Sequence, residues 1–134
     1  MQVLLKRGVC GLAAVLLTAS VASAVTEDLS IEQDADLLPG RTEITVTVNV
    51  QCTLDENATL TVYVFQPHGR LLNIGIGSHS FVCGGGLETF PVQVFAVPGF
   101  TFQPGPASAI VRSATGAGAS VDATRDAGAK IKLK

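Results

Sequence analysis

The two histidines beyond the first 24 residues are the side chains best suited to acid–base chemistry, but neither has a context that favours catalysis. His68 lies in the turn sequence Pro67-His68-Gly69, where exposed polar residues are common, and His79 lies between two serines. Nucleophilic catalysis needs a nucleophile, a base and an orienting group held together, and no aspartate is singled out as a partner of His79. The chain also lacks the G-x-S-x-G pattern of a hydrolase. We therefore predict no catalytic residues and a protein that is not an enzyme.

Metal-binding patterns are equally sparse. No pair of cysteines or histidines has the spacing of a zinc site such as C-x₂-C or H-E-x-x-H. Glu32, Asp34 and Asp36 could hold calcium weakly, although an acidic segment of this kind is more simply a solvated surface. We predict no metal and no cofactor.

The first 24 residues have the three parts of a cleavable signal peptide. Lys6 and Arg7 precede an apolar run over residues 9–19, and Ala22-Ser23-Ala24 supplies the small residues that a signal peptidase reads. The alternative is an uncleaved anchor, but a run of about 11 residues is short of the roughly 20 that a membrane-spanning helix needs. We predict a signal-peptide helix over residues 1–24, cleavage after Ala24, and a secreted protein that stays in the medium or at the cell wall, with no membrane span after cleavage.

Cleavage changes the charge of the protein. The chain has 9 Lys+Arg and 11 Asp+Glu, and only Lys6 and Arg7 are lost, which leaves 7 minus 11, or −4. A mildly acidic protein lacks the basic surface of nucleic-acid binders. We predict no nucleic-acid partner and one domain over residues 25–134.

The cysteines then pair by elimination. Cys10 leaves with the signal peptide, so Cys52 and Cys83 remain in an exported chain, where two cysteines are typical of one disulfide. The bridge would close a loop of about 32 residues, which contributes roughly 3–4 kcal/mol by chain-entropy arithmetic.

Period-two alternation dominates the predicted mature chain and indicates half-buried antiparallel strands. In residues 42–52 the apolar positions are Ile44, Val46, Val48, Val50 and Cys52, with polar residues between them. Further strands are predicted near 29–31, 59–65, 70–77, 89–97 and 107–113. Because the apolar phase shifts between Ile76 and Phe81, we expect a bulge or turn within residues 77–80. Residues 114–129 are ambiguous between a weak hairpin and a mobile segment, and Ile131 and Leu133 suit a closing edge strand protected by lysines.

About seven short strands in a domain near 100 residues favour an all-β fold, an immunoglobulin-like antiparallel β-sandwich. The alternative is a small closed barrel. The pattern contains no second domain and no repeat.

One apolar surface is expected outside the core. Tyr63 and Phe65 lie on the face of their strand opposite its buried residues, and so do Phe95 and Val97 on theirs. If the two strands share a sheet, these residues form a contiguous patch, which the loop residues Phe100 and Phe102 extend. Exposed apolar area with aromatic residues marks partner or ligand surfaces. We predict the partner-binding residues to be Tyr63, Phe65, Phe95, Phe100 and Phe102; burial of this face by the C-terminal or acidic segment, or self-association, are the alternatives.

Several short motifs occur in order between residues 42 and 113. They are Cys52 at the end of a Val/Thr strand, Tyr63-Val64-Phe65-Gln66, Gly69-Arg70, Gly75-Ile76-Gly77, Phe81-Val82-Cys83-Gly84 and Phe102-Gln103-Pro104-Gly105-Pro106-Ala107. In these motifs the chain resembles a group of small exported actinobacterial proteins with an immunoglobulin-like domain and no assigned function. The resemblance implies a Gram-positive, high-GC host and carries no catalytic residues across.

The function expected from these observations is a non-enzymatic exported binding or surface-interaction module. Its partner would be a protein or a small apolar ligand, and its oligomeric state is left open. The alternative is a structural subunit of an envelope or extracellular assembly, in which the sheet edges and the lysine-bearing C-terminal strand pair with other subunits.

Overall fold

The computed structural model describes residues 26–116 and 123–134, and the regular structure within them is entirely β. The strands are β1 (Thr26–Ile31), β2 (Asp34–Leu37), β3 (Glu43–Cys52), β4 (Asn57–His68), β5 (Leu71–Val82), β6 (Leu87–Ala96), β7 (Gly105–Gly116) and β8 (Ala123–Leu133). The prediction of an all-β fold is confirmed.

The alternation along the strands directs every second side chain into the interior of the molecule. β3 is the clearest case, because its buried positions are the five predicted from the sequence. β4 buries Leu60, Val62 and Val64, and β6 buries Val92 and Val94. All of these residues belong to one hydrophobic core, as expected of strands with one apolar face.

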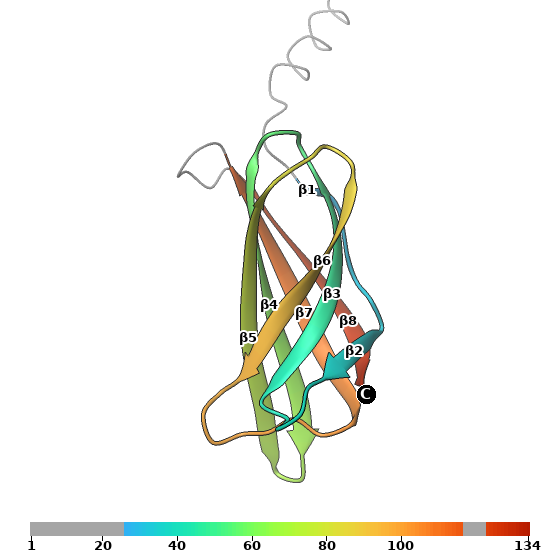
Figure 1. The fold of residues 1–134 in the computed structure, drawn as a ribbon, viewed down its shortest axis with the longest axis vertical. Helices are drawn as coiled ribbons and strands as arrows, with labels where there is room; N and C mark the ends of the chain where they lie inside the picture. The colour runs from blue at the N-terminus through green and yellow to red at the C-terminus, as the bar shows by residue number, and fades with distance from the viewer. Residues whose placement is uncertain (1–25, 117–122) are drawn as a thin grey trace, which may run out of the picture.

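The strands close into a barrel (Figure 1). Neighbours are paired in the order β3-β2-β8-β7-β4-β5-β6, and β6 returns to β3 over nine residue pairs. β1 lies beside β2 on the same edge of β3. A sandwich would leave two separate sheets, whereas here β5 pairs with β4 along its full length and with β6 at Gly75 and Ile76. The closed barrel, which was the alternative prediction, therefore describes the pairing better than the sandwich does.

β8 is not the free edge strand that the sequence suggests. It pairs with β7 over eleven positions, and on its other side Asp34 and Ala35 of β2 pair with it in parallel. Backbone hydrogen bonds from Lys132 to Gln33 and from Lys134 to Ala35 extend this contact. Ile131 and Leu133 are buried as predicted. The lysines that alternate with them lie on a strand that is paired on both sides, so they do not protect a free edge.

β5 is regular where a bulge is predicted. Its register against β4 runs without a break from Leu71 to Val82. The apparent change of apolar phase arises because Ile74 and Ile76 face outward, while the inward positions are glycines 75 and 77. Gly77 lies so close to β6 that a Cβ atom there would overlap the carbonyl oxygen of Gln93. Glycine therefore permits the contact through which β5 and β6 close the barrel.

Replacing Gly77 with alanine is expected to lower the free energy of unfolding by about 1–3 kcal/mol, the usual range for overpacking. The added methyl group meets backbone, which cannot rotate away. Gly86→Ala is the matched control, because a Cβ atom at Gly86 meets nothing within 4 Å. Urea unfolding of both variants measures the difference, and equal midpoints would contradict this account of the closure.

The predicted disulfide is present. Cys52 at the end of β3 and Cys83 after β5 are bonded, with Cα atoms 5.7 Å apart, and both are buried. The Cys83 amide donates to the Glu56 carbonyl, and its carbonyl accepts from the Asp55 amide, both at 2.8 Å. The bridge therefore belongs to the core and ties the β5–β6 connection to the β3–β4 connection.

The predicted signal-peptide helix and Cys10 lie outside the described residues. Of the ambiguous stretch 114–129, β7 reaches Gly116 and β8 begins at Ala123, which agrees with the hairpin alternative, while residues 117–122 are outside the described ranges. Within those ranges no helix has the length and apolar character needed to span a membrane.

Candidate functional site

Four neighbouring strands carry a row of apolar side chains on the outside of the barrel. The register places Ile110 of β7 opposite Tyr63 of β4, Tyr63 opposite Ile76 of β5, and Ile76 opposite Phe95 of β6. Phe95 is 56% exposed, Ile76 47% and Ile110 42%, and Tyr63 is half-buried. Facing side chains on adjacent strands touch, so these four residues form one continuous surface, the apolar row.

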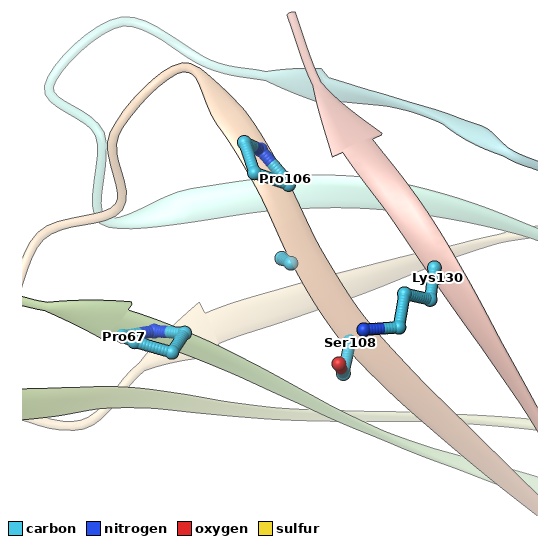
Figure 2. A pocket seen from close by; sticks show the side chains of 5 residues that line it. Pro67, Pro106, Ser108 and Lys130 are labelled. Atoms are coloured by element: carbon cyan, nitrogen blue, oxygen red, sulfur yellow. The ribbon is translucent and has the colours of Figure 1, made fainter.

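Two hollows adjoin this row on the β4–β7–β8 face. The first, of about 380 Å³, is lined by Tyr63, Phe65, Ile110, Arg112 and Asp126. The second, of about 220 Å³, is lined by Pro67, Pro106, Ala107, Ser108 and Lys130. Figure 2 shows Lys130 extending from β8 toward Ser108 of β7, with Pro67 on β4.

The register makes these hollows consecutive parts of one depression along β7, which we call the trough. Phe65 of the first hollow lies opposite Ser108 of the second, and Ser108 lies opposite Lys130. The depression exists because two outward positions are small: Ser108, and Gly128 opposite Ile110. A Cβ atom on Gly128 would make only ordinary van der Waals contacts, the nearest at 3.7 Å, so a side chain there would meet no clash.

The trough carries charge at both ends, but only one end is neutralised internally. At one end Arg112 donates two hydrogen bonds to the Asp126 carboxylate, at 2.8 and 3.2 Å. The bond to Asp126 raises the pKa of Arg112, and the bond from Arg112 lowers the pKa of Asp126. Both side chains are more than half exposed, so solvent screens the pair and it contributes little to stability. At the other end Lys130 has no ion-pair partner among the described residues.

No protein-family model and no curated protein matches this chain. Among solved structures, Spo0M, a sporulation control protein from Bacillus subtilis, is similar over 85% of this chain at 15% identity and a TM-score of 0.33. The chain spans 50% of the length of that protein. We draw neither fold nor function from a likeness of this size.

The predicted binding residues are only partly brought together. Tyr63 and Phe65 line the trough, but Phe95 lies on β6, which is not a neighbour of β4; β5 intervenes and Ile76 connects the two. Phe100 is half-buried in the loop after β6. Phe102 is 0% exposed and belongs to the core, so it is not part of the outer surface.

Ile76, Ile110, Gly128 and Lys130 were missed by the sequence reasoning. The outward face of Ile76 and Ile110 is recognised only from neighbouring strands. Lys130 was predicted to alternate with Ile131 and Leu133, but nothing in the sequence places it on the same surface as Phe65. Ile110 is flanked by Ala109 and Val111, and all three are apolar. Strand phase alone therefore does not decide which of them faces out.

The candidate chemical residues lie apart from the trough. His68 is exposed at the end of β4. The imidazole of His79 lies 4.8 Å from the ring of Phe90 and 5.9 Å from that of Phe81, and it has no hydrogen-bond partner in the described part of the chain. Asp34 is bonded to Lys134 at 3.1 Å, and residues 26–116 and 123–134 contain no cluster of His, Cys, Asp or Glu suited to a metal ion.

Proposed function

We propose that this protein is an exported, non-enzymatic binding module that uses the apolar row and the trough as its binding surface. The observation that carries the proposal is the continuity of apolar side chains over β7, β4, β5 and β6. Single exposed apolar residues are ordinary on protein surfaces, but contiguous ones mark interaction sites.

The outer face of β3, the next strand after β6, differs from the apolar row. The outward residues of β3 are polar, and two of them bond to outward polar residues of β6. Thr45 donates to Gln93 at 3.1 Å, and Thr89 donates to Asn49 at 2.7 Å. Hydrogen-bonded cross-strand pairs of this kind satisfy a wall that faces water. The outer face of β3 is therefore polar, in contrast to the apolar row.

The Cys52–Cys83 disulfide supports the proposal that the protein is exported. A buried disulfide persists in oxidising compartments and is rare in a reducing cytosol. The bridge and the predicted signal peptide therefore support one location, outside the cell in the medium or at the cell wall.

The proposal is tested with N-phenyl-1-naphthylamine, an uncharged apolar dye whose fluorescence rises on binding. We expect the wild-type protein to bind the dye, and the double variant Tyr63→Ser/Phe65→Ser to lose most of the signal, because the aromatic wall of the trough is gone. Leu71→Ser is the control, since Leu71 is 60% exposed but lies at the first position of β5, outside both hollows. Absence of dye binding, or equal loss in the control, would contradict a binding surface at this place.

A structural subunit is the alternative function, and one observation favours it. β5 and β6 are paired in register only at Gly75–Ala96 and Ile76–Phe95, so beyond these positions the facing edges of the two strands form no ladder with each other. Such edges can accept strands from other chains. The Val97 amide donates to the Ile74 carbonyl, so the backbone positions of β6 at even spacing from Val97 point toward β5. Pro91 occupies one of these positions and has no N–H, which protects this edge of β6. Light scattering that grows with concentration would support the subunit instead of the module.

The strand order supports the finer proposal of an immunoglobulin-like fold. β1, β3, β6 and β5 are successive neighbours, as are β4, β7 and β8. These two groups correspond to the ABED and CFG sheets of an immunoglobulin domain. On this proposal the long β4–β5 ladder and the β2–β8 contact join the two sheets into a barrel.

A further inference from the structure

We propose that the trough binds a single-chain anionic amphiphile, with its acidic head group at Lys130 and Ser108 and its hydrocarbon chain over Phe65, Tyr63 and Ile110. This inference rests on the proposed binding function and specifies the chemical class of the ligand.

The charge of the trough selects an anion. The charge of Arg112 is balanced by the Asp126 carboxylate, to which it donates two hydrogen bonds, so this pair offers no net charge to a ligand. Lys130 lines the second hollow and has no carboxylate partner within the described residues. Ser108, directly opposite on β7, adds a hydroxyl donor. An ammonium beside a hydroxyl suits a carboxylate or a phosphate.

The strands under the trough are hydrogen-bonded on both sides, which favours a hydrocarbon chain over a peptide as the ligand. β7 is hydrogen-bonded to β4 on one side and to β8 on the other, and β4 is bonded to β5 on its far side. The floor therefore has no free N–H or C=O groups with which to pair an extended peptide. A peptide lying there would bury its own amides without partners, which is costly, whereas an alkyl chain has none to satisfy.

The length of the trough limits the chain. The outward residues Lys130 and Asp126 are four positions apart on β8, which corresponds to about 13 Å at the rise of a strand. The Arg112–Asp126 pair closes that end. A head group at Lys130 thus leaves room for a medium-length chain over Phe65, Tyr63 and Ile110.

The test is calorimetric titration of the protein, purified after export with its bridge oxidised, with decanoate, a carboxylate whose extended chain is of similar length. We expect decanoate to bind, decanol to bind about tenfold more weakly, and decyltrimethylammonium to show no binding. Lys130→Gln should weaken decanoate about tenfold, as loss of a charged hydrogen bond does. Lys132→Gln is the matched control, because it removes the same charge from the same strand outside both hollows.

A second variant tests whether decanoate binds in the trough without changing the charge of the protein. Gly128→Val adds a side chain to the trough at a position where a Cβ atom meets no clash, and it should weaken decanoate binding at least tenfold. Gly86→Val, which changes glycine in the same way outside the trough, should not. Equal effects of Lys130→Gln and Lys132→Gln, or equal binding of decanol and decanoate, would overturn the proposal. So would binding of an acidic Val/Glu peptide but not of decanoate.

The two proposals fail differently. If the uncharged dye binds at Tyr63 and Phe65 but decanoate does not bind, the anionic amphiphile is wrong and the binding surface stands. If neither binds, both proposals are wrong.

Discussion

Replacing Phe102 with alanine is expected to lower the free energy of unfolding by about 3–5 kcal/mol, the cost of a phenylalanine-sized cavity in a core. Phe102 is the largest wholly buried side chain in the described residues, and its ring occupies the space beside Gly75 that a Cβ atom would need. It enters the barrel from the loop between β6 and β7. Urea unfolding followed by circular dichroism measures the loss.

The loop is held on both sides of Phe102, so it cannot relax easily into the cavity. The Phe102 amide donates to the Arg41 carbonyl at 2.7 Å, and the buried Asn73 side chain donates to the Thr101 carbonyl at 2.7 Å. Gln66, also buried, donates to the Gln103 carbonyl at 2.7 Å and accepts from its amide at 2.8 Å.

Phe100→Ala is the control for this prediction. Phe100 lies two residues earlier in the same loop but is only half-buried, so its loss should cost clearly less. Equal destabilisation by the two variants would mean that the loop as a whole, and not the Phe102 side chain, supports the barrel.

Removing the disulfide is expected to cost about 2–5 kcal/mol, since the bridge restricts the unfolded chain of a small exported domain. Typical domains have only 5–15 kcal/mol of stability, so the loss would be a large share of the total. The double variant Cys52→Ala/Cys83→Ala avoids a free thiol, and thermal unfolding measures its midpoint against that of the wild type.

Reductant supplies the internal control for the bridge. It should lower the melting temperature of the wild-type protein toward that of the double variant and leave the variant unchanged. A wild-type midpoint that does not move under reductant strong enough to break the bridge would contradict a stabilising role for it.

Strands with strict alternation were predictable because the pattern itself separates the two faces. β3 is the example: five apolar positions alternate with polar ones, and the structure buries all five. The pairing of Cys52 with Cys83 was predictable for a different reason, since the predicted loss of the first 24 residues leaves two cysteines.

Strands that are apolar or glycine on both faces misled the prediction. On β5, Ile74 and Ile76 are apolar but face outward, and Gly75 and Gly77 occupy the core side because Phe102 and the β6 backbone fill the space there. Hydrophobicity alone assigns the isoleucines inward and requires a bulge that does not exist. Phe102 is the opposite error, a loop aromatic assigned to the surface that completes the core.

The residues that could do chemistry, and the absence of a pattern bringing them together, were determined by the sequence, because motif spacing is local. So were the all-β class and the facing residues of the alternating strands. Only the tertiary structure decided that the strands close into a barrel, and that Tyr63 and Phe65 share one outer face with Ile110, Gly128 and Lys130. Those neighbours come from strands distant in sequence, and their contact depends on a register that hydrogen bonding and close packing impose once the barrel has closed.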